Sequence, residues 1–228
     1  MSDLSNWKPC ATPGRVALDG TYTRLEPLNW DTHGEGLATA VAGHDSDELW
    51  HYMAYGPFEG VHDLRQAFDA AIRAQGWCTM VIRARASGEI LGMASYMRNR
   101  ETMGSTEVGC VTFAKKLQRT TIATEAIYLM ARHVFEDLGY RRFEWKCHAQ
   151  NAASMRAAVR FGFIYEGTFR NDMVFKGRNR DTAWYSMIDS EWPDLDAAFR
   201  AWLSPENFDE AGQQRATLEA YRKALQAA

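Results

Sequence analysis

The sequence lacks both a large excess of charge of one sign and any long hydrophobic run. Lys and Arg total 26 against 29 Asp and Glu, a formal net charge of −3 over 228 residues. A protein that binds nucleic acid or an anionic membrane through its overall charge is usually strongly basic, so we expect neither partner, although a local basic site stays open. No hydrophobic run is long enough to cross a bilayer, and residues 1–14 contain no apolar segment of a signal peptide. We therefore expect a cytoplasmic protein.

Cysteine is also scarce, and its spacing excludes two further classes. The four residues Cys10, Cys78, Cys110 and Cys147 lie far apart, with no CxxC pair and no spacing typical of metal ligands. Three of them stand in apolar runs, where a reduced cysteine packs as a small hydrophobic side chain. We expect a reducing compartment, no disulfide framework and no metal site.

What the sequence does contain is an ordered succession of strand and helix patterns. Strands are predicted at 22–28, 77–84, 89–98, 106–113, 141–147, 164–175 and 180–188. Helices are predicted as two or three short pieces within 30–75, then at 120–138 and 151–162, and in a tail at 194–203 and 208–226. The strand–helix–strand–helix order in the middle requires at least one parallel crossover in a mixed sheet. The pattern alone therefore indicates an α/β or α+β fold.

The segment 108–126 carries the first sign of chemistry, because it runs from a strand through a turn into the clearest helix. A helix N-terminus offers unpaired N–H groups and the positive end of the helix dipole, which suit a pyrophosphate. Gln118 and Arg119 stand at its entrance, with Lys115 and Lys116 just before them. A basic turn that only precedes an amphipathic helix is the alternative.

Four motifs in this order resemble those of the GCN5-related N-acetyltransferases (GNAT family), most closely the RimJ/RimL-type branch. Gln118-Arg-Thr-Thr-Ile-Ala123, followed by Thr124-Glu-Ala126, resembles motif A of the family, [Q/R]-x-x-G-x-[G/A]. The other three are Phe135-Glu-Asp-Leu-Gly-Tyr-Arg-Arg142, then Asn151-Ala-Ala-Ser154 with Arg160-Phe-Gly-Phe163 and Glu166-Gly-Thr-Phe-Arg170, and finally Arg180-Asp-Thr-Ala-Trp-Tyr-Ser186. Thr120 and Thr121 replace the motif-A glycines, which we interpret as a subfamily variation that keeps both backbone N–H groups.

The resemblance implies the fold and the domain boundaries. We expect a mixed central sheet of about six or seven strands with helices on both faces, splayed between strands 106–113 and 141–147. Residues 1–15 would form an N-terminal extension, 16–193 the acetyltransferase domain and 194–228 a helical C-terminal extension. Because the extension carries an apolar stripe, it should pack on its own domain, or alternatively on a second copy, so monomer and homodimer both stay open.

The resemblance also implies acetyl-CoA as cosubstrate, with no metal. Its pyrophosphate would lie over the backbone of 119–124, and its pantetheine arm would run along 111–113. The expected coenzyme-binding residues are Val111, Thr112, Phe113, Gln118, Arg119, Thr120, Thr121, Ile122, Ala123, Thr124 and Asn151.

The catalytic residues follow from the same resemblance. The acceptor amine would attack the thioester directly, and the departing thiolate needs a proton. Much of the family uses a Tyr where this chain has Ala158, whereas RimL-type members offer the Ser that corresponds to Ser154; a helix-entry serine that only bonds the backbone is the alternative.

The general base is less closely indicated. Some RimL-type enzymes have a Glu where this chain has Met173, and neighbouring Asp172 would point to the opposite face of a regular strand. Glu107 is therefore the first choice, His148 the second, and a water chain without a single base the third.

The acceptor amine stays open among three kinds. A protein or peptide N-terminus, a small amine and an aminoacylated toxin each fit the resemblance, and a catalytically silent CoA-binding protein is the alternative from another class. The aromatic residues of 50–58 would shape the acceptor pocket or pack in the core. Arg170, Arg178 and Arg180 would hold an anionic acceptor group, unless Arg180 pairs with Asp181.

Overall fold

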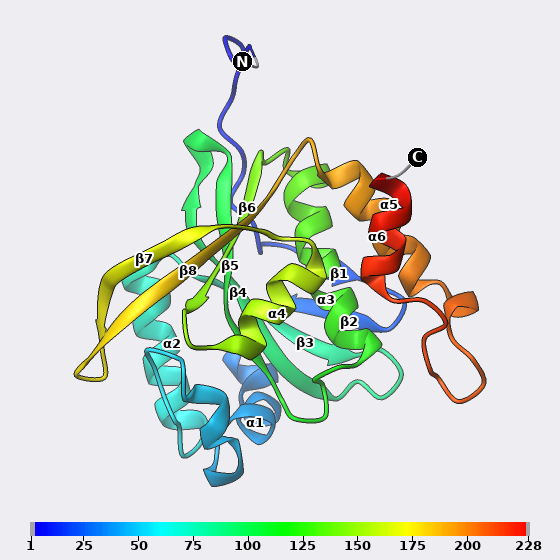
Figure 1. The fold of residues 1–228 in the computed structure, drawn as a ribbon. Coiled ribbons are helices and arrows are strands. Elements are labelled where there is room, and N and C mark those ends of the chain that lie inside the picture. The colour runs from blue at the N-terminus through cyan, green and yellow to red at the C-terminus, as the bar shows by residue number, and fades with distance from the viewer. Residues whose placement is uncertain (1–2, 227–228) are drawn as a thin grey trace.

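The computed structural model describes residues 3–226, and eight strands form one sheet in the order β1-β2-β3-β4-β5-β6-β8-β7 (Figure 1). The strands are β1 (Leu18–Asp19), β2 (Thr23–Pro27), β3 (Cys78–Ala84), β4 (Ile90–Arg100), β5 (Ser105–Phe113), β6 (Arg142–His148), β7 (Ile164–Phe175) and β8 (Arg178–Ile188). The mixed sheet is confirmed, whereas the expected count of six or seven strands misses β1. Two residues are too few for β1 to show a hydrophobic period of its own.

Helices cover both faces of the sheet, as predicted (Figure 1). They are α1 (Trp30–Val41), α2 (Val61–Gln75), α3 (Thr121–Arg132), α4 (Ala152–Phe161), α5 (Trp192–Leu203) and α6 (Leu218–Gln226), with a 3-10 segment η1 (His44–Trp50). Alternate residues of β3 enter different apolar clusters: Val81 packs with α1 and α2, while Met80 and Ile82 pack with α3. None of the helices among residues 3–226 has the length and apolar character needed to cross a membrane.

Strands β5 and β6 pair over only part of their length. They run parallel and pair from Ser105 with Arg142 to Val108 with Trp145, and then separate. On the other side of β5, the pairing with β4 shifts register between Met93 and Ser95, next to Cys110, whose φ of 47° marks a bulge. The bulge bends β5 away from β6 and confirms the predicted splay.

The C-terminal extension packs against α3 and the rest of the main core. Phe199 and Leu218 are fully buried there, and the Tyr128 hydroxyl donates to Asp196 at 2.9 Å. Helix α5 matches the prediction for 194–203, but the prediction of one helix over 208–226 is wrong, because only Leu218–Gln226 is helical. Buried Asn207 holds the intervening loop, since its Oδ1 accepts from Ala216 N at 2.9 Å. Residues 1, 2, 227 and 228 of the two expected extensions lie outside the described residues.

Candidate active site

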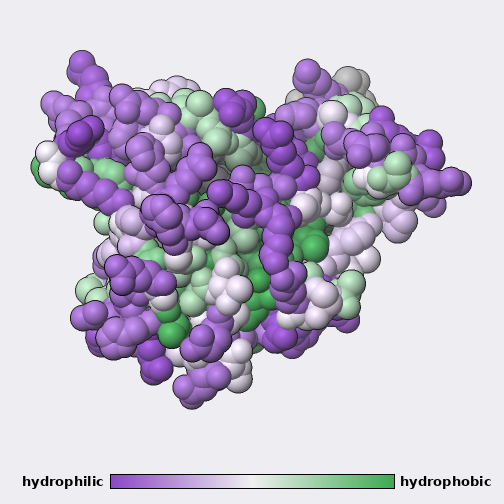
Figure 2. Space-filling view, turned by 90° about the horizontal axis from the view of Figure 1, so that it is seen from below, coloured by the Kyte–Doolittle hydropathy of each residue, from purple (hydrophilic) through white to green (hydrophobic). Residues whose placement is uncertain are grey.

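The site lies where β5 and β6 separate, at the end of the molecule where α3 and α4 begin (Figure 1). Beyond Val108, the edge of β5 that faces β6 has no strand partner among the described residues, so its peptide groups can pair with an extended ligand. Val111, Thr112 and Phe113 are on this open stretch, as expected. Figure 2 views this end of the molecule and shows hydrophobic residues recessed between hydrophilic ones.

The N-terminus of α3 follows β5 after a seven-residue loop, 114–120. Thr120 is the N-cap: its hydroxyl accepts from Ala123 N at 3.2 Å and donates to Leu117 O at 2.7 Å. This cap leaves the N–H groups of Thr121 and Ile122, in the first helical turn, for another acceptor. The Thr120 hydroxyl is itself engaged in the cap.

The other residues expected around the pyrophosphate have distinct positions. Gln118 donates from its side-chain amide to Phe113 O at 3.1 Å, which shapes the loop. Arg119 is exposed and has a left-handed backbone, with φ of 62°. Thr124 is only 2% exposed, and its hydroxyl accepts from Arg160 at 3.0 Å, so its side chain serves the contact between α3 and α4.

Asn151 and Ser154 open α4 beside the same gap. The Asn151 side chain accepts from Ser154 N at 3.0 Å, which makes it the N-cap of α4. The Ser154 hydroxyl accepts from Trp145 Nε1 at 3.0 Å. Since Trp145 belongs to the last β5–β6 pair, this contact holds Ser154 at the point of separation, with its own hydroxyl proton left to donate.

Glu107 lies on the opposite face of the sheet. It is 1% exposed, with Lys146 Nζ at 3.3 Å and Arg98 Nε at 3.7 Å from Oε2. Burial, with a smaller contribution from nearby Glu144, raises the pKa of Glu107 to about 7 against the attraction of these two cations. A carboxyl with this pKa can accept a proton near neutral pH.

Gly109 lets the Glu107 carboxyl reach the gap. A Cβ at position 109 would lie 2.8 Å from Glu107 Oε1, so the carboxyl lies over the first residue beyond the last β5–β6 pair. Sequence reasoning missed both Gly109 and Glu144, which pairs in register with Glu107. Alternation along β6 could have placed Glu144 on one face of its strand, but only the register of β5 and β6 places it beside Glu107.

The remaining candidates lie farther along the same face. His148 Nδ1 accepts from Gln150 N at 3.0 Å, and burial and Arg180 lower the pKa of His148, which favours its neutral form. Its ring is 5.3 Å from that of Tyr52, whereas Trp50 is fully buried in the core.

The charged residues of β7 and β8 differ in exposure. Arg180 is buried against Phe175, while Arg170 and Arg178 are exposed. Asp181 accepts from Asn171 N at 2.8 Å and from Asn179 Nδ2 at 3.0 Å, so the considered Arg180–Asp181 pair is replaced by these contacts.

Asp172 lies within an irregular stretch of β7, where the register shifts between Phe169 and Met173. The alternation argument that would turn Asp172 away therefore does not hold. Asp172 lines a cavity of about 330 Å³ together with Glu144 and Trp184. Met173, where other members have a Glu, is 38% exposed and carries no titratable group.

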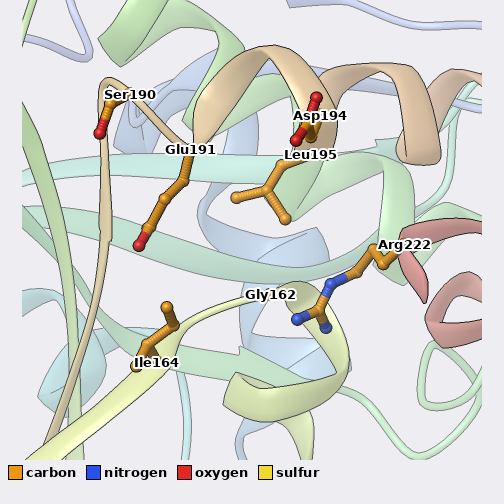
Figure 3. A pocket seen from close by; sticks show the side chains of 7 residues that line it. All are labelled: Gly162, Ile164, Ser190, Glu191, Asp194, Leu195 and Arg222. Carbon is orange, nitrogen blue, oxygen red and sulfur yellow. The ribbon is translucent and has the colours of Figure 1, made fainter. Parts of the chain in front are cut away.

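A second cavity, of about 160 Å³, lies between the end of α4, the turn before α5, and α6 (Figure 3). Arg222 points into it beside Gly162 and donates to Val159 O at 2.6 Å, which caps the C-terminus of α4. The tail thereby supports the helix that carries Ser154. Within residues 3–226, no group of three or more His, Cys, Asp or Glu side chains is arranged to hold a metal.

Comparison with known proteins gives a consistent result. A family profile described as "Acetyltransferase (GNAT) domain" matches residues 24–164. The crystal structure of a GCN5-related N-acetyltransferase from Brucella melitensis is 43% identical, with a TM-score of 0.91 over 96% of this chain and 100% of that one. A structure from Chromobacterium violaceum, described as a probable acetyltransferase of the GNAT family, is 37% identical, with a TM-score of 0.79 over 85% and 96%.

One curated relative matches over a shorter stretch. "Putative ribosomal N-acetyltransferase YdaF" from Bacillus subtilis is 28% identical over 105 residues, which are 46% of this chain. The match spans 57% of the length of that relative.

Proposed function

The chain belongs to the GNAT family of acetyltransferases, and from this we propose that it transfers the acetyl group of acetyl-CoA to the primary amine of a peptide or protein N-terminus. The observation that carries the proposal is the gap between β5 and β6, with Glu107 on one face and Ser154 on the other. Two substrates can then meet in the gap from opposite sides of the sheet. The name of the Bacillus subtilis relative supports a protein terminus as acceptor.

In this proposal, acetyl-CoA is bound by backbone groups. The pyrophosphate accepts from the free N–H groups of Thr121 and Ile122 at the positive end of α3, and the pantetheine arm pairs with the open edge of β5. The residues present fit this ligand, because both sets of peptide groups are free among the described residues.

The reaction then proceeds by direct attack. The amine nitrogen bonds to the acetyl carbonyl carbon, and the carbon–sulfur bond breaks. Glu107 accepts the proton that the amine loses, and Ser154 donates a proton to the departing CoA thiolate and regains one from solvent. The products are the N-acetylated acceptor and free CoA.

A screen of acetyl-CoA consumption tests the proposal. The panel contains tripeptides with free N-termini, small amines including polyamines and aminoglycosides, and aminoacyl nucleotides. Tripeptides are expected to release CoA fastest. Turnover confined to small amines or aminoacyl nucleotides would assign the acceptor to that class, and binding of acetyl-CoA without release over the whole panel would indicate a silent protein.

Thr121→Glu is expected to weaken acetyl-CoA binding at least about tenfold, because it places like charge and extra volume at the proposed pyrophosphate site. Isothermal titration calorimetry with acetyl-CoA measures the change. Thr39→Glu, which adds the same group at an exposed position of α1, is the matched control. Equal affinity in the two variants would place the pyrophosphate elsewhere.

Ser154→Ala is expected to lower kcat by about 10- to 100-fold while KM for acetyl-CoA changes less than about twofold, because it removes a proton donor and little binding surface. Steady-state kinetics with a tripeptide acceptor measure the split, with exposed Ser190→Ala as control. A variant with near wild-type kcat would leave Ser154 as a helix-entry residue that only bonds Trp145 and the Asn151 cap.

A further inference from the structure

The cavity of about 330 Å³ on the Glu107 face of the sheet is separate from the proposed coenzyme-binding residues. We call it the β4–β7 cavity. Its walls come from four strands, with Arg98 and Arg100 on β4, Glu144 on β6, Phe169 and Asp172 on β7, and Trp184 on β8.

Two buried polar atoms on residues of this wall have no hydrogen-bond partner among the described residues: Glu144 Oε2 and Trp184 Nε1. Glu144 is 3% exposed, and its other oxygen accepts from Arg100 and, at 2.8 Å, from Arg142. A buried donor or acceptor without a partner costs about 1–3 kcal/mol, so such atoms usually meet water or a ligand. Trp184 can only donate, and a carboxylate oxygen can only accept.

Glu144 and Trp184 share one face of the sheet, because Trp184 pairs in register with Lys146, two residues after Glu144. One acceptor and one donor on the same face complement a peptide group, whose carbonyl accepts and whose N–H donates. The cations of the wall are already engaged: Arg100 pairs with Glu144, and Arg98 lies 4.9 Å from the centre of the Trp184 ring and 3.7 Å from Glu107. Arg142, also on the wall, pairs with Glu144 and Glu166, so the cavity presents no free cation to a carboxylate. Asp172 is exposed and has no ion-pair partner among the described residues, so it leaves one negative charge at the cavity. Phe169, whose ring lies 5.2 Å from that of Trp184, adds an apolar wall for a side chain.

The register places this cavity near the gap. Glu144 pairs with Glu107, whose carboxyl lies over Gly109, where the two strands begin to separate. The cavity therefore lies two or three strand residues from the gap at Gly109. At about 3.3 Å per residue, the separation between gap and cavity is roughly 7–10 Å. A peptide whose terminal amine lies at Gly109 would place its second or third residue at this distance, because an extended chain has the same rise per residue.

We propose that the β4–β7 cavity binds the backbone of the second and third residues of a peptide acceptor, with Trp184 donating to a carbonyl and Glu144 accepting from an N–H. This inference rests on the proposed function. According to this inference, Trp184 and Glu144, two residues outside the reacting centre, determine the preference for a peptide over a small amine.

Kinetics of two acceptors test the inference. Trp184→Phe keeps an aromatic ring and removes the N–H. It is expected to lower kcat/KM about tenfold for trialanine amide, and by a clearly smaller factor for alaninamide, which ends before the cavity. Trp202→Phe, which removes an N–H that donates to Gln214 Oε1 at 2.8 Å in the C-terminal extension, is the matched control. An equal loss for both acceptors would overturn the inference.

A change in the peptide gives a second test, whose first step uses the wild-type protein alone. Replacing each backbone amide of trialanine amide in turn by an ester removes one N–H. One of these esters is expected to lose about tenfold in kcat/KM with the wild-type protein, and less with Glu144→Gln. If no ester loses activity, the cavity does not bind the backbone. Absence of acetyl transfer to trialanine amide and alaninamide alike would contradict the proposed function first, and the inference with it.

Discussion

Glu107→Gln is expected to lower kcat about 100-fold, because an amide of nearly the same size cannot accept the proton of the attacking amine. The wild-type carboxyl is fitted for this step by its position over Gly109 and by the burial that raises its pKa to about 7. Stopped assays of product formation at saturating acetyl-CoA measure the change. Glu35→Gln, at an exposed position of α1, is the control for loss of one charge.

The pH dependence of kcat/KM tests the role of Glu107 independently. A base acts when deprotonated, and the folded-state pKa of Glu107 is raised, so wild-type kcat/KM should rise as pH increases through about 7. In Glu107→Gln the rise of kcat/KM with pH should instead follow deprotonation of the acceptor amine, whose α-amino pKa is about 8. The midpoint of the profile therefore shifts to higher pH. An unchanged profile with near wild-type activity would transfer the role to His148 or to a water chain.

Truncation after Pro193 is expected to leave a chain that does not fold to a stable, soluble protein. The cut removes Phe199, Trp202, Leu203 and Leu218, which are all buried in the main core. Each such side chain contributes about 1.5–3 kcal/mol when buried. Their sum is comparable with the 5–15 kcal/mol that separates typical folded and unfolded states. Soluble yield and thermal unfolding measure the outcome.

If the truncated chain cannot be isolated, a single substitution in the tail still allows its contribution to the free energy of unfolding to be measured. Phe199→Ala should lower the free energy of unfolding by about 3–5 kcal/mol, because it opens a cavity in a fully buried position. Leu225→Ala, on the partly exposed face of α6, should change it by less than about 1 kcal/mol. A soluble, fully active and equally heat-stable fragment ending at Pro193 would show that the tail is dispensable.

Much of the fold could be predicted because its signals are local. Apolar runs, alternation and turn residues placed β3 to β7 within one or two residues, and Asn151 and Gly162 bounded α4 as expected. The failures arise where tertiary contacts decide. The helix predicted over 208–226 rested on Phe208 and on apolar residues from 218 onward, with no large apolar side chain at 209–217. Hydrogen bonds of buried Asn207 hold 208–217 in an irregular conformation.

In the candidate site too, the residues of a local motif could be predicted, whereas those brought together by distant strands could not. Ser154 and Asn151 follow from a motif within one turn of a helix, so the sequence could bring them together. The carboxyl pair of Glu107 and Glu144 depends on the register of two strands more than 30 residues apart, and the β4–β7 cavity on four strands. Thr120 illustrates the limit within a motif, because its hydroxyl serves equally well as a helix cap or a phosphate ligand until its neighbours are known.

The most direct test of the account is the fate of an isotopically labelled acetyl group. The purified full chain is incubated with carbonyl-labelled acetyl-CoA and a tripeptide with a free N-terminus, and the products are sequenced by tandem mass spectrometry. The account predicts the label on the N-terminal nitrogen of the peptide, with one free CoA released for each acetylated peptide. Unlabelled peptide together with intact acetyl-CoA, when calorimetry shows that acetyl-CoA is bound, would contradict it.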